Sequence, residues 1–153
     1  MNLLLFDAIL RLYEQNFRNL HWNSAGMEFN DSHKDITTGY YEMISKDVDD
    51  VAEILHMLNV YPLNYIEAAN MIMKAEKQYY VVNSSTNYSR GDICKAADIM
   101  LRDICEMLAE IIQALEDPLD AGIKSFFEDM LFRYTKEARY LNKRRLTPVS
   151  GEE

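Results

Sequence analysis

Four long stretches of helical hydrophobic periodicity, each ended by a clear break, constrain the fold of this chain more than any other feature. Apolar residues recur at intervals of three and four over about residues 3–23, 31–58, 89–115 and 119–145. Glycine and proline, which interrupt helices, mark the breaks and total only eight in 153 residues. So few of them disfavour a fold built from strands and turns. The pattern predicts an all-α protein.

A shorter amphipathic segment, about residues 64–77, lies in the connection between the second and third long helices. It is too short to be an equal member of a bundle. Four long helices joined by one long connection, with a short extra helix in that connection, make a ferritin-like four-helix bundle. We therefore expect one ferritin-like domain over residues 1–146, followed by a flexible tail over residues 147–153.

Residues that suit helix N-caps precede the second and third long helices. Asp31 or Ser32 is predicted to cap the second helix, and Ser89 or Asp92 the third. Their side-chain oxygens can accept hydrogen bonds from the first free backbone amides of a helix. These residues indicate where each helix begins.

Charge and cysteine content narrow the class of protein. With 25 acidic and 16 basic residues, the net charge of −9 repels phosphate backbones and attracts cations.

Cys94 and Cys105 lie eleven residues apart on one predicted helix. This spacing is about 16 Å along the helix axis, which is too far for a disulfide. The N-terminus lacks the basic region of a signal peptide, and no stretch reaches transmembrane length. We expect a cytoplasmic protein with no membrane partner.

Two histidines and two carboxylates form a candidate metal-binding set. His21 lies at the end of the first predicted helix and His33 at the start of the second. Asp49 and Glu53 are four residues apart on the second helix, so both side chains project from one face. Imidazole nitrogen and carboxylate oxygen together suit a borderline divalent cation such as Fe²⁺.

The spacing of these residues adds a condition. Sixteen residues separate His33 from Asp49 on one predicted helix, about 24 Å at a rise of about 1.5 Å per residue. Ligands of one metal ion lie about 2 Å from it, so one chain cannot assemble the site. If the set binds metal, the histidines of one subunit must face the carboxylates of another, and a two-fold dimer then makes two equivalent sites.

The sequence around these residues resembles the signature of the Dps mini-ferritins. In that family a His-Trp-Asn step ends the first helix, a second histidine follows twelve residues later, and Asp-x-x-x-Glu with Ala before the Glu lies on the second helix. Here the run at residues 20–29, LHWNSAGMEF, contains His21, and His33, Asp49 and Glu53 follow at similar places. The resemblance extends more loosely over the whole chain.

This resemblance implies a function and an assembly. It implies a ferroxidase that oxidises Fe²⁺ with peroxide or dioxygen, stores iron as Fe³⁺ and protects against oxidative damage. It also implies a hollow dodecamer built from two-fold dimers that pair through the second helix, and a redox role for Trp22. DNA binding is not expected, because the lysine-rich N-terminal arm of the DNA-binding members is absent here.

Two departures from the family pattern concern the metal site. Thr37 stands where the family has an acidic ligand four residues after the second histidine, and Asp35 comes two residues early. The gap from His33 to Asp49 is also one residue longer than in the family. An inserted residue in a helix often forms a π-bulge, which we expect near residues 37–39. These changes predict an impaired second metal position.

The sequence is also compatible with two alternative functions. One is a ferritin-like cage with a degenerate metal site, acting as a structural or DNA-protecting protein. The other is a di-iron carboxylate site inside one bundle, for which Glu53 and His56 supply one Glu-x-x-His step. That alternative needs a second such step on the fourth helix, where Glu137 is followed three residues later by Tyr140.

Overall fold

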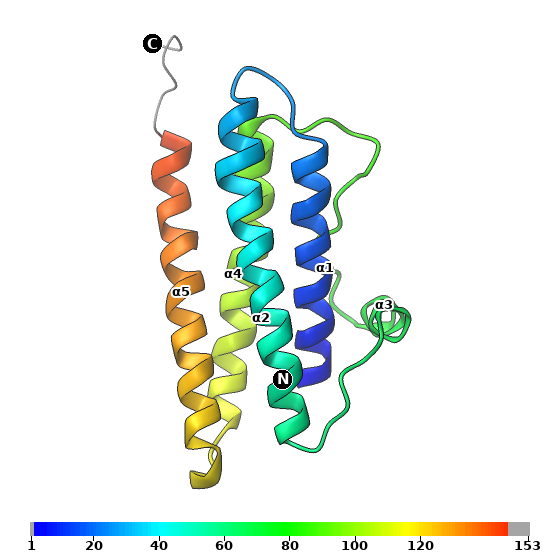
Figure 1. The fold of residues 1–153 in the computed structure, drawn as a ribbon, viewed down its shortest axis with the longest axis vertical. Helices are drawn as coiled ribbons and strands as arrows, with labels where there is room; N and C mark the ends of the chain where they lie inside the picture. The colour runs from blue at the N-terminus through cyan, green and yellow to red at the C-terminus, as the bar shows by residue number, and fades with distance from the viewer. Residues whose placement is uncertain (1, 147–153) are drawn as a thin grey trace.

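Four long helices run side by side, and a short helix lies against one of them (Figure 1). The computed structural model describes residues 2–146, without the side chains of residues 142 and 144–146. The described helices are α1 (Leu3–Trp22), a π-helical segment η1 (Asp31–Thr37), α2 (Thr38–Met57), α3 (Tyr65–Lys74), α4 (Arg90–Ala114), a 3-10 turn η2 (Pro118–Asp120) and α5 (Ala121–Leu146). The predicted tail over residues 147–153 lies outside the described residues.

The order and direction of the helices match the predicted ferritin-like bundle. In Figure 1, α1 and α5 run upward while α2 and α4 run downward, so the connection from α2 to α4 spans the length of the bundle. This connection contains α3, which packs against α1. The sequence-based prediction of an all-α bundle with a short helix in a long crossover is confirmed.

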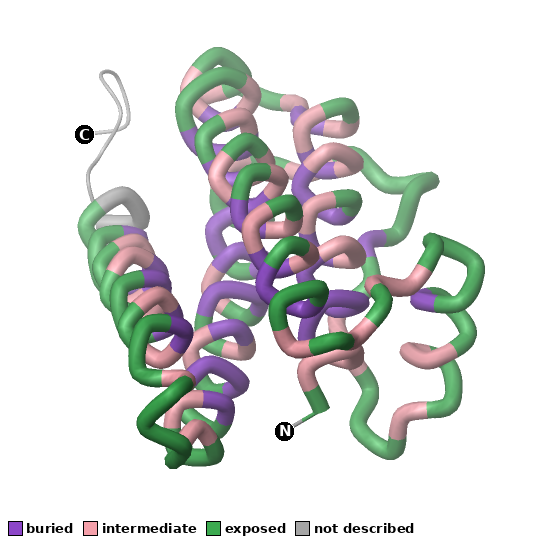
Figure 2. The backbone as a smooth tube through the Cα atoms, turned by 60° about the horizontal axis from the view of Figure 1, so that its bottom comes forward, coloured by how far each residue is buried: buried purple, intermediate pink, exposed green. Residues whose placement is uncertain are grey.

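The core follows the predicted hydrophobic stripes. On α1 the large apolar side chains that are fully buried recur at helical spacing, and they are Phe6, Ile9, Leu10, Tyr13, Phe17 and Leu20. Corresponding residues of α2, α4 and α5 complete one continuous core. Figure 2 shows these buried positions turned toward the interior on each long helix. The inward faces are almost wholly apolar, which explains why the helices associate.

Helix caps were predicted correctly for α4 but not for the start of α2. Ser89 accepts a hydrogen bond from the amide of Asp92, whose side chain reaches back to the Ser89 amide, forming a capping box. Neither Asp31 nor Ser32 caps a helix. Asp31 is instead 2.7 Å from the Nε of Arg90, and Ser32 is fully buried. Residues that suit an N-cap also suit ion pairs and turns, so the sequence did not distinguish these roles.

The crossover is fixed to α1 by side-chain hydrogen bonds. The buried Asn16 donates from its amide nitrogen to the carbonyl of Tyr80 at 2.8 Å, and its oxygen accepts from the amide of Val82 at 3.3 Å. Arg11 donates to the carbonyl of Leu63. These contacts satisfy backbone groups that the irregular crossover would otherwise leave unpaired. They place the end of the crossover beside the end of α1, which carries His21.

A buried carboxylate links α2 to α5. Asp47 is 1% exposed and accepts hydrogen bonds from Arg133 at 2.9 and 3.0 Å and from the hydroxyl of Tyr134 at 2.7 Å. Burial raises the pKa of Tyr134, and the negative charge of Asp47 raises it further, so the phenol stays a hydrogen-bond donor. The network satisfies all the polar groups that it brings into the core.

Neither Cys94 nor Cys105 forms a disulfide within the described residues, and we expect both thiols to react slowly. Cys94 is buried, and Cys105 is half-buried with its Sγ 3.7 Å from the Oγ1 of Thr135. Burial raises the pKa of the Cys105 thiol, so at pH 7 its thiolate fraction is smaller than that of an ordinary cysteine. Iodoacetamide should therefore modify Cys105 more slowly than a free cysteine, with a rate that rises with pH toward the raised pKa. Mass spectrometry of the digested protein measures this rate, and labelling at the rate of free cysteine would contradict it.

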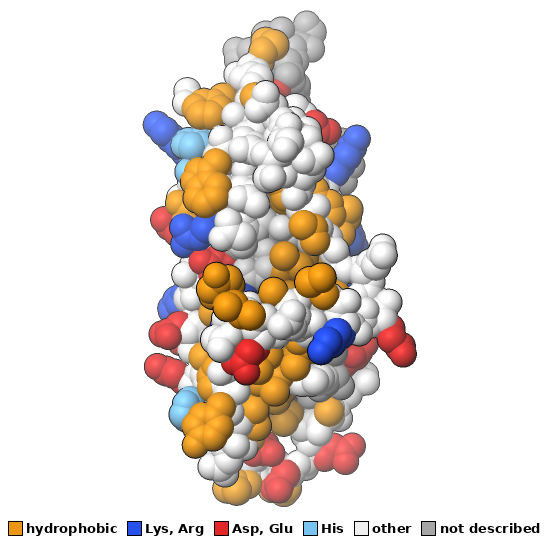
Figure 3. All heavy atoms as spheres, turned by 90° about the vertical axis from the view of Figure 1, so that its right-hand side faces the viewer, with side chains coloured by type: hydrophobic (Ala, Val, Ile, Leu, Met, Phe, Trp, Pro, Cys, Tyr) orange, Lys and Arg blue, Asp and Glu red, His pale blue; other side chains and the backbone are white. Residues whose placement is uncertain are grey.

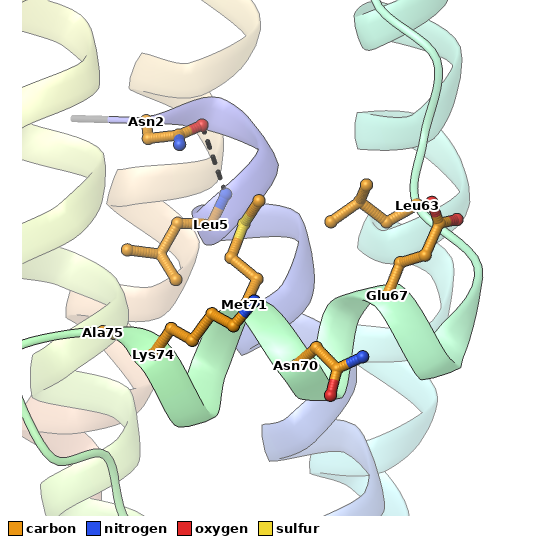
Figure 4. A pocket seen from close by; sticks show the side chains of 8 residues that line it. All are labelled: Asn2, Leu5, Leu63, Glu67, Asn70, Met71, Lys74 and Ala75. Carbon is orange, nitrogen blue, oxygen red and sulfur yellow. Dashed lines mark hydrogen bonds between the residues drawn. The ribbon is translucent and has the colours of Figure 1, made fainter.

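A pocket of about 510 Å³ lies between the start of α1 and α3. Figure 4 shows the side chains of Leu5, Leu63 and Met71 there, with Glu67 and Lys74 among the polar lining groups. No histidine lines this pocket, so it does not contribute to the predicted metal set. Within residues 2–146, no helix has both the length and the hydrophobicity needed to cross a membrane.

Candidate metal centre

The two histidines singled out in the sequence lie against each other. His21 is in the last turn of α1, and His33 is in η1, the π-helical segment that leads into α2. Their rings stack with centroids 3.7 Å apart and planes 15° from parallel. The short loop between α1 and η1 turns the chain back, so residues twelve apart in sequence become neighbours.

Each histidine is hydrogen-bonded to the backbone of the other. The Nδ1 of His21 is 2.7 Å from the carbonyl oxygen of His33, and the Nδ1 of His33 is 2.9 Å from the carbonyl oxygen of His21. A carbonyl oxygen can only accept, so each Nδ1 must carry the proton. In the neutral imidazole the lone pair is then on Nε2. Both rings therefore present Nε2 as the nitrogen available to a metal ion.

Aromatic side chains surround the stacked pair. Phe29 stacks near His33 with ring centroids 4.8 Å apart, and Tyr41 meets His21 edge-on at 5.4 Å. Trp22 is 63% exposed and Phe29 is 40% exposed, although large aromatic rings are usually buried. The imidazoles thus lie in an apolar, half-buried setting at the surface.

The loop before η1 is held by the far end of the crossover. Ser24 and Tyr88 form an isolated bridge, in which the amide of Ala25 donates to the Tyr88 carbonyl at 2.9 Å. Arg90, the first residue of α4, contacts Asp31 at 2.7 Å and Glu28 at 3.4 Å. These contacts join three distant segments around the histidines. Arg90 was not predicted from the sequence, because helix periodicity gives no signal for a part-buried ion pair between separate elements.

The predicted carboxylate ligands do not lie with the histidines. Asp49 and Glu53 are exposed on α2, and Asp49 is twelve residues beyond the end of η1, about 18 Å along the helix. Within residues 2–146 no group of three or more His, Cys, Asp or Glu side chains is placed to hold a metal ion. The carboxylates and the histidines thus lie apart within one chain, at the separation that their spacing predicted. The assignment of its four ligands stays a prediction.

The extra residue between His33 and Asp49 forms a π-helix, as predicted, but closer to His33. The π-helical segment covers Asp31–Thr37, whereas the sequence placed the bulge near residues 37–39. A π-helix accommodates the additional residue in a wider turn. Thr37, at the end of this segment, is fully buried. It therefore faces the interior beside the histidines.

The structure contradicts the alternative of a di-iron site inside the bundle. Glu53 and His56 are both exposed on α2, so their side chains point away from the core. The ring of His56 packs edge-on against Tyr61, with centroids 5.5 Å apart. Apolar side chains fill the centre of the bundle. The Glu-x-x-His spacing was correct, but spacing alone could not show that this face of α2 is the outer one.

Similarity to solved structures identifies the fold. Helicobacter cinaedi CAIP matches with a TM-score of 0.81 and 21% identity, over 94% of this chain and 96% of that chain. Antigen TpF1 from Treponema pallidum matches with a TM-score of 0.80 and 18% identity, over 95% of this chain and 89% of that one. A Dps protein from Vibrio cholerae O1, a member of the ferritin-like diiron-carboxylate superfamily, has a TM-score of 0.77 and 18% identity, covering 92% and 84%.

The fold is that of the Dps proteins. No family model and no curated protein matches the sequence. The resemblance to Dps proteins seen in a few sequence positions thus extends to the backbone path over 92–95% of the chain. Because identities near 20% establish a fold rather than an activity, the function must be argued from the residues of this chain.

Figure 3 views the molecule from the side that carries α3. Histidine side chains reach the surface on this side, and hydrophobic side chains lie beside them. His21 and His33 are both partly exposed, so groups supplied by a second molecule can reach them.

Proposed function

We propose that this protein is a ferroxidase and iron-storing cage that oxidises Fe²⁺ at sites shared between two subunits. The observation that carries the proposal is the His21–His33 pair, in which both Nδ1 atoms are bound to backbone carbonyls. Metal-binding histidines are commonly held in this way, with one ring nitrogen bonded to the protein and the other free for the metal. The pair is thus a preorganised half of a metal site.

The second half of the site comes from Asp49 and Glu53 of a neighbouring subunit. Both carboxylates are exposed, and their spacing puts them on one helix face. A two-fold dimer that brings this face of α2 to the histidines completes two equivalent sites. The exposed ring of Phe29 lies against His33, and Trp22, next to His21 in the sequence, is also exposed, so a neighbouring subunit would remove both rings from water. We propose that such dimers assemble into a closed cage, with twelve subunits as in the Dps resemblance.

The ring geometry bears on how iron binds. The Nε2 lone pairs lie in two nearly parallel planes, and the ring centroids are 3.7 Å apart. Each ring can therefore bind its own cation without moving, whereas sharing one cation requires a rotation of the rings. Two Fe²⁺ ions together supply the two electrons that reduce one hydrogen peroxide, with two protons, to two water molecules. The Fe³⁺ formed collects in an acidic protein with a net charge of −9.

Iron oxidation by single-histidine variants tests the proposal. The wild-type protein should oxidise Fe²⁺ faster than protein-free buffer, with peroxide or dioxygen as oxidant, and the ferric product should elute with a large oligomer. A His33→Ala variant should oxidise Fe²⁺ only at the buffer rate, because half of the nitrogen donors are gone. His56→Ala is the matched control, since His56 is exposed on α2 and outside the proposed set, and it should keep the wild-type rate.

The same experiment distinguishes a ferroxidase from a ferritin-like cage whose metal site is degenerate. If the protein forms a large oligomer but oxidises Fe²⁺ no faster than buffer, the proposed assembly stands and the proposed ferroxidase activity is wrong. A wild-type rate in His33→Ala would reject the assignment of His33 as a ligand. Loss of activity in His56→Ala would place the site elsewhere on α2.

A further inference from the structure

We infer that Thr37 is a positioning residue, whose hydroxyl holds the imidazole of His21 in the orientation and tautomer that a metal ion requires. The hydroxyl of Thr37 donates to the carbonyl oxygen of His33 at 2.9 Å and lies 3.0 Å from the Nδ1 of His21. Its effect on metal binding rests on the proposed function, whereas its effect on the tautomer does not. From the sequence alone, Thr37 is noticed only because it stands where the Dps pattern has an acidic ligand.

The carbonyl of His33 is the centre of this arrangement. It accepts from the Nδ1 of His21 at 2.7 Å and from the hydroxyls of Thr37 and Thr38, each at 2.9 Å. The Oγ1 of Thr38 also lies 3.3 Å from the Nδ1 of His21. Two neighbouring hydroxyls thus act on the same carbonyl that fixes the His21 ring. Because the hydroxyl hydrogens of Thr37 and Thr38 point to this carbonyl, their oxygens are left to accept from the Nδ1–H of His21, which keeps the proton on Nδ1 and the lone pair on Nε2.

The side chain at position 37 lies on the Nδ1 side of the His21 ring, where it cannot supply a ligand to a metal ion on Nε2. The Thr37 hydroxyl approaches Nδ1 of His21, whereas a metal ion would bind Nε2, whose lone pair points away from Nδ1. The buried side chain at position 37 faces one acceptor, the carbonyl of His33, and one donor, the Nδ1–H of His21. A carboxylate here would face that carbonyl without a proton to donate. A hydroxyl, which both donates and accepts, suits the position.

A purely structural role for Thr37 is the competing explanation. Threonine hydroxyls in helices often donate to the carbonyl four residues earlier, and the hydrogen bond from Thr37 to the His33 carbonyl follows this pattern. The approach to His21 does not, because His21 belongs to α1, sixteen residues earlier in the chain. The two explanations differ in what happens to the His21 ring when the hydroxyl is removed.

Nuclear magnetic resonance of the metal-free protein tests the inference. With ¹⁵N-labelled histidine, wild-type His21 and His33 should both show the tautomer protonated at Nδ1. Thr37→Val keeps the shape of the side chain but removes the hydroxyl, so the Nδ1–H of His21 loses one of its acceptors and the His21 signals should shift toward those of the tautomer protonated at Nε2. Thr37→Ser keeps the hydroxyl and should give the wild-type spectrum. The inference is wrong if Thr37→Val leaves the His21 signals unchanged. Thr37→Ala, which also lacks the hydroxyl, gives the same test if Thr37→Val does not fold, and unchanged His21 signals in Thr37→Ala would overturn the inference.

Binding of Co²⁺ to the assembled protein gives a second readout. Thr37→Val should weaken Co²⁺ binding about tenfold, as expected when a group that orders a metal ligand is lost, and Thr37→Ser should restore it. Thr37→Asp should not raise the number of Co²⁺ ions bound per subunit, and an increase would overturn the inference. If wild-type protein binds no Co²⁺ yet shows the Nδ1 tautomers and the Thr37→Val change, the proposed function fails while the positioning role stands.

Discussion

Replacing Asp47 with alanine is expected to lower the free energy of unfolding by about 3 kcal/mol, the lower end of the range for breaking a buried ion pair. The carboxylate is 1% exposed and accepts three hydrogen bonds, two from Arg133 and one from Tyr134. Without it, the buried Tyr134 hydroxyl has no acceptor and the guanidinium of Arg133 loses its counter-charge. The Arg133 side chain is 37% exposed, so water can partly replace the carboxylate, which is why the lower end applies.

Urea unfolding, followed by circular dichroism, measures this loss. Tyr134→Phe removes one donor and should cost about 1 kcal/mol. Glu128→Ala removes an exposed carboxylate from α5 and should change stability by no more than about 0.5 kcal/mol. An Asp47→Ala protein that unfolds at the same urea concentration as Glu128→Ala would show that the network contributes little.

The positions of the helices could be predicted because burial imposes a period on the sequence. The stripe of Phe6, Leu10, Tyr13 and Phe17 predicted the buried face of α1, and those side chains are fully buried. The sequence predicted the short helix over about residues 64–77, whereas α3 ends at Lys74. The hydrophobic pattern does not mark where this largely exposed helix ends. Element order and length then restricted the topology to a ferritin-like bundle, which the structure shows.

The details of the candidate site could be predicted only in part. The spacing of His33 and Asp49 predicted that the two residues lie far apart in one chain, as they do, since a helix has a fixed rise. The stacking of His21 on His33 and their reciprocal bonds depend on how a loop closes, which no local pattern records. The contacts of Thr37 depend on the π-helical turn. A family pattern therefore marked Thr37 as a departure without indicating what the residue does.

A shared site predicts that two inactive variants restore each other. In His33→Ala assemblies every site lacks a histidine, and in Glu53→Ala assemblies every site lacks a carboxylate, so each variant alone should be inactive. In a dimer of one chain of each kind, one site carries both changes and the other carries neither. Random pairing in an equal mixture makes half of the dimers mixed, so about a quarter of all sites should be intact.

A matched mixture controls for effects of mixing itself. His21→Ala and His33→Ala both alter the histidine half of the site, so every site in their mixed dimer still carries one change. This mixture should stay inactive, although its subunits exchange in the same way. Recovery in this control would mean that activity returns for reasons other than a rebuilt site.

The rate of Fe²⁺ oxidation by co-assembled His33→Ala and Glu53→Ala chains tests the shared site most directly. Both chains are produced in one cell, and the mixed oligomer is isolated by two different affinity tags. The shared site predicts about a quarter of the wild-type rate in an equal, randomly paired mixture, and no recovery with His21→Ala in place of Glu53→Ala. A mixed oligomer as inactive as its two parents, beside an active wild-type oligomer, would contradict a site built from the histidines of one subunit and the carboxylates of another.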